Sequence, residues 1–255
     1  MRRLAYSLLF LIFALPLGSI SGPANADGFS LRITLWRTQS ETDGPHRADA
    51  PLVAHFVPDQ GASFVLDRST TPPLLRFEDS PEIWILQPQP APRGDTIYRN
   101  DIGQPMLRAT KLGGLTLFTA DNPAGAAAAF DGEAVSLRPP ALMPPGVLFQ
   151  HLLQAGDRWS RAAQKRIPFS TVDDATPQTA ALVAESAIVT AEAFGRVSHM
   201  VNGRTALARI GRVMLARGHN PDAKLSGGAL TITYSPDNSS GQWPSSERIV
   251  QIITK

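Results

Sequence analysis

The apolar positions of the chain fall into an N-terminal run and two halves with different periods. Residues 4–17 are almost wholly apolar. Between Phe29 and Phe118, short apolar or alternating runs recur about every ten residues, as in β-sandwiches and barrels. From Gly146 onward, apolar residues take the spacing of helices. The pattern predicts an α+β fold: an N-terminal β-rich sandwich or barrel-like part, then a helical segment and C-terminal strands.

Short strands are predicted throughout the first half, in residues 27–120. Segments rich in Pro, Gly, Asn and Asp separate them, and these residues favour turns. The predicted strands cover residues 31–36, 52–57, 63–66, 74–77, 83–86, 96–98, 106–110 and 115–119. Residues 121–145 contain four consecutive alanines and two Pro-Pro pairs, which indicate a Pro/Ala-rich linker.

Helices are predicted in the second half, residues 146–255. An apolar face begins at Val147 and ends near Gly156, and residues 157–166 fit a second helix. A further Ala-rich helix is expected to begin at Thr176-Pro177 and to stop at Gly195. The remaining predictions are a helix or a strand over 204–217 and closing strands over 230–234 and 249–254. The two halves are either separate domains or one.

Residues 1–26 have the pattern of a secretory signal peptide. Arg2 and Arg3 precede the apolar run, and Ala24-Asn25-Ala26 provides small residues at a cleavage site. An uncleaved membrane anchor is the competing interpretation, but the run has 14 residues where a spanning helix needs about 20. We therefore expect a periplasmic or secreted protein with no stable membrane anchor after cleavage.

Cleavage changes the charge of the chain. The full chain has 24 basic and 22 acidic residues, and removal of 1–26 takes away two arginines and no acid. The mature chain is then neutral, which argues against a nucleic-acid partner. The absence of cysteine excludes a disulfide scaffold and a thiol-ligated metal. Apolar residues make up 43% of the chain, enough to fill a core.

Three segments resemble one family of exported bacterial proteins known as a domain of unknown function. They are Leu74–Asp79, then Pro92–Gly103 continuing through 107–110 and 113–116, and finally Pro244–Ile249. The resemblance spans nearly all of the mature chain. It implies an envelope protein of unassigned activity and transfers no catalytic role to any residue.

The densest group of polar residues lies near the middle of the β-rich part. Arginine forks facing a cleft bind carboxylate or phosphate through paired hydrogen bonds. Ordinary turns with surface ion pairs, such as Arg93 with Asp95 and Arg99 with Asp101, are the alternative. The candidate ligand-binding residues are Arg93, Asp95, Arg99, Asp101, Arg108 and, from the C-terminal segment, Arg248.

Ser245-Ser246-Glu247-Arg248 has two interpretations. The hydroxyls and the arginine fork can line an anion site, or the segment can be the turn before the last strand. We accordingly expect a non-enzymatic binding protein for a small anionic ligand or an envelope protein partner.

The alternative function is a periplasmic hydrolase that uses paired carboxylates. Asp67, Glu78, Asp79 and Glu82 lie close together in the sequence, with Arg68 beside them. Two carboxyl groups across a cleft can act as general acid and base. Sequence spacing does not give the separation that this mechanism requires.

Other catalytic patterns are missing from the sequence. It contains no Gly-x-Ser-x-Gly, Ser-x-x-Lys or His-Glu-x-x-His motif, and no two of its five histidines have a metal-ligand spacing. We expect no cofactor and no metal. Glu185 and Glu192 share a face of the Ala-rich helix and have the pattern of solvated helix charges.

Overall fold

The computed structural model describes residues 51–171, 175–239 and 241–255. The predicted signal peptide and the predicted strand over residues 31–36 lie outside the described residues.

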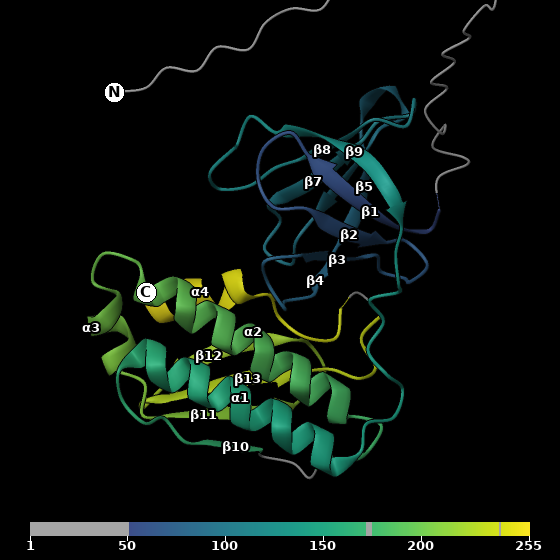
Figure 1. Ribbon diagram of the computed structural model, residues 1–255. Coiled ribbons are helices and arrows are strands. Elements are labelled where there is room, and N and C mark those ends of the chain that lie inside the picture. Colours follow the sequence, from purple (N-terminus) through teal and green to yellow (C-terminus); the bar gives the residue numbers. More distant parts are fainter. Residues whose placement is uncertain (1–50, 172–174, 240) are drawn as a thin grey trace, which may run out of the picture. The chain divides into compact units, whose positions relative to one another are not determined.

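The first part of the described chain is a nine-stranded antiparallel sheet that nearly closes on itself (Figure 1). Strands that follow one another in sequence pair with each other except for β4 and β5, and β1 pairs with both β2 and β9. The two edges of the sheet, β4 and β5, are separated in sequence by Leu86 alone. The strands are β1 (Val53–Pro58), β2 (Phe64–Asp67), β3 (Leu74–Phe77), β4 (Trp84–Ile85), β5 (Gln87–Pro90), β6 (Thr96–Arg99), β7 (Pro105–Ala109), β8 (Leu115–Leu117) and β9 (Ala126–Glu133). A sandwich or barrel was predicted, and the barrel-like form is observed.

Alternation along the strands fills the barrel with side chains. Inward residues from successive strands, including Phe64, Leu75 and Leu107, form one core cluster. All four residues of β2 are buried, because its outward residues are covered as well. Val65 belongs to a second core cluster that includes the helices. The outer wall of the barrel therefore shares a core with the second half.

The linker interpretation of residues 121–145 is wrong for residues 126–133. This segment forms β9, which pairs with β8 and β1 and brings the sheet round to its first strand. Alanine has weak strand propensity, but pairing with strands on both sides overrides local preference.

The second part is a four-stranded sheet with helices packed on it. Its order is β10-β11-β13-β12, parallel except for β12. The strands are β10 (Phe169–Thr171), β11 (Arg212–Arg217), β12 (Asp222–Ser226) and β13 (Ala229–Tyr234). The helices are α1 (Pro145–Ala163), α2 (Ala180–Ser198), α3 (Gly203–Ala208) and α4 (Ser246–Thr254), and Figure 1 shows α1 and α2 side by side. The buried side chains of β11 and β13 alternate with partly exposed ones, so one face of this sheet is covered more fully.

Several predicted boundaries in this half need correction. The two helices predicted over 146–166 are one helix, α1. Helix α2 begins at Ala180, after a turn that starts at Thr176, and it passes Gly195 to end at Ser198, because Gly195 does not take the positive φ that terminates a helix. Residues 204–217 contain helix α3 and then strand β11, so both alternatives hold in succession.

The closing strand predicted over 249–254 is wrong, because residues 246–254 form helix α4. Ile249, Val250 and Ile253 are buried together, which is the spacing of one helical face. Ser245 caps this helix by accepting a hydrogen bond from the Arg248 amide (3.2 Å). In the part of the chain that the structure describes, none of the helices is long and apolar enough to cross a membrane.

Candidate functional site

The six residues predicted as a ligand site divide into two groups in the structure. Arg93, Arg99 and Arg108 line one cavity on the barrel wall. Asp95 lies beside this cavity and pairs with Arg108. Asp101 and Arg248 instead pair with each other in a separate network at the start of α4.

The cavity lies outside the barrel wall, over β6 and β7. Tyr98 and Leu107 point into the barrel core, so their neighbours Arg99 and Arg108 point outward. The cavity has a volume of about 480 Å³. Its lining consists of three arginines and five less polar residues: Ala91, Pro92, Ile97, Pro105 and Phe118. We call it the arginine cavity.

Arg93 reaches the cavity from a strained turn. The 3₁₀ turn η1 (Pro92–Gly94) joins β5 to β6, and Arg93 takes the left-handed conformation with φ of 66°. This conformation costs a residue with a side chain roughly 1–2 kcal/mol. Arg93 makes no hydrogen bond or ion pair with the described residues. A strained backbone that holds an unpaired guanidinium at a cavity is a reason to suspect a binding role.

The other two guanidinium groups are already engaged. Arg108 donates through Nε and Nη2 to Asp95 Oδ2, at 2.9 and 2.6 Å. These bonds, with the Lys111 amide, hold the pKa of Asp95 below its ordinary value despite burial. Arg99 donates to Gln89 Oε1 (2.8 Å) and to the Gly103 carbonyl (2.7 Å). The predicted pairs Arg93–Asp95 and Arg99–Asp101 are therefore not the pairs observed.

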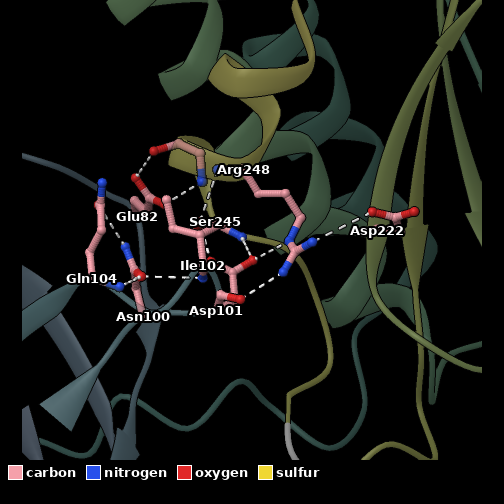
Figure 2. A network of polar contacts seen from close by, with 9 residues as sticks. Glu82, Asn100, Asp101, Ile102, Gln104, Asp222, Ser245 and Arg248 are labelled. Carbon is pink, nitrogen blue, oxygen red and sulfur yellow. Dashed lines mark hydrogen bonds and ion pairs between the residues drawn. The ribbon is translucent and has the colours of Figure 1, made fainter.

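Figure 2 shows the second group, which fixes the start of helix α4. Asp101 accepts from the Ser245 amide (3.1 Å), from the Ser245 hydroxyl and from Arg248 Nε (2.8 Å). Arg248 Nη2 also donates to the Asp101 carbonyl (2.7 Å). The Arg248 fork does bind an anion, as the sequence suggested, but the anion is the protein's own carboxylate. The turn interpretation of residues 245–248 is corrected to a helix start.

A second carboxylate, Glu82, holds the next residue of the same helix. Glu82 is 2% exposed, and its two oxygens accept from the Ser246 amide (2.8 Å) and hydroxyl (2.6 Å). Burial raises the pKa of Glu82 to about 7, although the bonds from Ser246 and the charge of Arg196 lower it and Glu192 raises it further. We call Glu82, Asp101, Ser245, Ser246 and Arg248 the α4 clamp.

The α2 carboxylates are not solvated helix charges, contrary to the sequence prediction. Glu192 pairs with Arg158 and accepts from the Ser80 hydroxyl (3.3 Å). One oxygen of Glu185 is buried without a hydrogen-bond partner among the described residues, and burial raises the pKa of Glu185 to about 7 despite the charge of Arg76. The signal in the sequence was the almost uninterrupted apolar character of the surrounding helix.

Two carboxylates of the hydrolase alternative, Asp67 and Glu78, lie apart in the structure. Asp67 and Glu78 lie at opposite ends of the β2–β3 pair, which spans about 10 Å. Asp67 is fully buried and accepts from Ser69 (amide 2.8 Å, hydroxyl 2.6 Å), the Ser136 hydroxyl (2.6 Å) and the Leu137 amide (2.9 Å). Burial raises the pKa of Asp67, but these bonds outweigh it and lower the pKa overall. Asp67 is thus a structural group that joins the barrel to residues 136–137.

One polar group was missed by the sequence reasoning. The ring of His55 on β1 lies between Asp131 (Nδ1–Oδ2 2.9 Å) and Glu78 (Nε2–Oε1 3.0 Å). Its acidic neighbours come from β9 and from the end of β3, so pairing across the sheet brings them together. Within the described ranges, no group of three or more acidic or histidine side chains has a geometry that holds a metal ion.

The chain is an α+β protein in which a nearly closed antiparallel barrel is joined to a layer of helices and strands. A cavity lined by three arginines lies on the barrel wall. The chain belongs to the family described as Domain of unknown function (DUF4908), whose profile matches residues 32–253. No curated protein and no solved structure matches the chain. The family resemblance is confirmed, and export of the chain stays a prediction.

Proposed function

We propose that this protein is an exported binding protein that holds a small anionic ligand in the arginine cavity. One observation carries the proposal. Arg93, Arg99 and Arg108 converge on a single cavity, and Arg93 is held there in a strained conformation without a hydrogen bond or ion pair to the described residues. Guanidinium forks bind carboxylate and phosphate groups through two parallel hydrogen bonds.

The charges around the cavity support an anion. Three guanidinium groups face one carboxylate, Asp95, which leaves an excess of positive charge. Asp95 also has a supporting role, because its bonds to Arg108 and to the Lys111 amide fix the orientation of the Arg108 fork. The volume of about 480 Å³ lies in the range of roughly 300–1,000 Å³ that small-molecule pockets have.

Isothermal titration with a set of carboxylates and phosphates tests the proposal. Arg93→Asn removes the guanidinium and keeps a residue type that tolerates the left-handed conformation. Arg166→Ala is the matched control, because Arg166 is exposed and does not line the cavity. We expect Arg93→Asn to weaken binding at least tenfold and Arg166→Ala to leave it unchanged. Equal binding by all variants, or binding of none of the anions by the wild type, would overturn the proposal.

A further inference from the structure

The arginine cavity has features that narrow the class of its ligand. We propose that the ligand is a monocarboxylate with an apolar body, such as a medium-chain aliphatic carboxylate. This inference rests on the proposed function and goes beyond it, because the proposed function requires only a small anion.

The lining indicates the apolar body. Five of the eight lining residues are not charged, and Ile97 and Phe118 provide large apolar side chains. Arginine side chains also present apolar stems beneath their charged ends. An inorganic anion would contact the guanidinium groups and leave most of the cavity to water. An apolar body would bury this surface, and each buried methylene is worth about 0.8 kcal/mol, or nearly fourfold in affinity.

The hydrogen bonds of each guanidinium group indicate which one receives the carboxylate. Arg108 is neutralised in part by Asp95, and Arg99 is committed to Gln89 and Gly103. Arg93 alone among these three makes no hydrogen bond or ion pair with the described residues, although its charge attracts Asp95. One free fork matches one carboxylate in a two-bond arrangement.

The geometry of the strands places the apolar side chain of Ile97 and the guanidinium group of Arg93 at different positions in the cavity. Ile97 on β6 lies directly opposite Arg108 on β7, and Arg99 is two residues from Ile97 on the same face. Arg93 comes from the turn that precedes β6. The apolar side chain of Ile97 is thus bordered by Arg99 and Arg108 on the strands. This arrangement fits a carboxylate head at Arg93 and an apolar body over Ile97.

A chain-length series tests this inference. Acetate, butyrate, hexanoate and octanoate are titrated into the whole protein, with inorganic phosphate and octan-1-ol as comparison probes. We expect affinity to rise two- to fourfold per methylene, and phosphate and octan-1-ol to bind at least tenfold more weakly than octanoate.

Each other outcome has its own meaning. Phosphate or acetate binding as tightly as octanoate would overturn the apolar body and leave the proposed function standing. Octan-1-ol binding as tightly as octanoate would overturn the carboxylate. Failure of every anion to bind would overturn the proposed function itself.

Variants of two residues that line the cavity test its apolar surface and its charged group separately. Ile97→Thr keeps a β-branched residue suited to the strand and removes apolar surface from the cavity. We expect it to reduce the gain in affinity per methylene and to leave acetate binding unchanged. Val57→Thr is the matched control, because Val57 is an exposed strand residue away from the cavity. Arg93→Asn should weaken all carboxylates by a similar factor. An unchanged chain-length gain in Ile97→Thr would place the apolar contact elsewhere and overturn the assignment.

Discussion

At the residue scale, the charged groups of Arg93 and Asp67 differ in how far their surroundings satisfy them with hydrogen bonds. Asp67 is buried, but four hydrogen bonds satisfy its carboxylate. Arg93 is exposed, makes no hydrogen bond or ion pair with the described residues and has a strained backbone. A satisfied buried carboxylate contributes to stability, because removing it leaves several donors without an acceptor. Arg93 has no such hydrogen bonds to offset its backbone strain, so its conformation points to a role in binding.

The first prediction concerns the stability of Arg93→Asn. Because asparagine adopts the left-handed conformation more readily than arginine, we expect the free energy of unfolding to stay equal or to rise by up to about 1 kcal/mol. Urea unfolding followed by circular dichroism measures this change. A loss of more than about 1 kcal/mol would show that Arg93 stabilises the fold, and weaker ligand binding by this variant would then lose its meaning as evidence for a site.

At the element scale, helix α4 is held at its first turn by carboxylates that come from two loops of the barrel. Glu82 precedes β4, and Asp101 lies between β6 and β7. They accept the amides of Ser246 and Ser245, which a helix start leaves without partners of its own. Arg196 of α2 donates to the Ser246 hydroxyl (2.9 Å) and pairs with Glu247. The buried interface between the barrel and the helices therefore contains titratable groups.

The second prediction is a pH dependence of stability that arises at this interface. The pKa of Glu185 is about 7 in the folded protein and 4.5 as an ordinary carboxyl group. The folded state therefore binds the proton more tightly, so the stability from this group is fully present below pH 4.5 and is lost as the pH rises through 7. Glutamine has no charge to desolvate. We expect Glu185→Gln to raise the free energy of unfolding at pH 8 by at most about 3 kcal/mol and to change it little at pH 4.5.

Urea unfolding at pH 4.5, 6, 7 and 8 measures this difference. Arg76 from β3 faces Glu185. Glu82 is faced by Arg196 and Glu192 from α2 and by Ser246 from α4. Glu133→Gln is the control, because Glu133 is an exposed carboxylate at the end of β9. Parallel stability curves for wild type and Glu185→Gln would contradict the raised pKa.

At the scale of the whole described chain, strands β2, β3 and β4 each contribute residues to both hydrophobic cores. Phe64 and Leu66 of β2 point into the barrel, and Val65 of the same strand packs in the second core. Trp243, which precedes α4, donates to the carbonyl of Ile83 (3.1 Å). A strand that belongs to both cores is expected to couple their unfolding.

The third prediction is a single unfolding transition for both parts. Trp84 lies in the barrel core and Trp159 in the second core, so each part contains its own probe. With 5-fluorotryptophan incorporated, the native ¹⁹F signals of both residues should disappear at the same urea concentration. Two separate midpoints would show that the barrel and the helical layer unfold independently.

The sequence by itself determined the features that depend on local pattern. Short apolar runs between turn residues identified strands β1, β2, β3, β6, β7 and β8, because turn residues mark where a strand begins and ends. The sequence also grouped Arg93, Arg99 and Arg108, because successive strands of an antiparallel sheet lie side by side in space. The α+β class followed from the change of period at Gly146.

Only the tertiary structure decided the features that depend on distant partners. Strand β9 was hidden because its alanines gain their conformation from pairing with β1 and β8. The Asp101–Arg248 pair was predicted as part of a ligand site, but residues 147 positions apart meet at the start of α4 and neutralise each other. The burial of Glu82 was equally invisible, because the residues that cover it belong to other elements. Local pattern sets which face of an element is apolar, and long-range packing sets which charges remain free to bind.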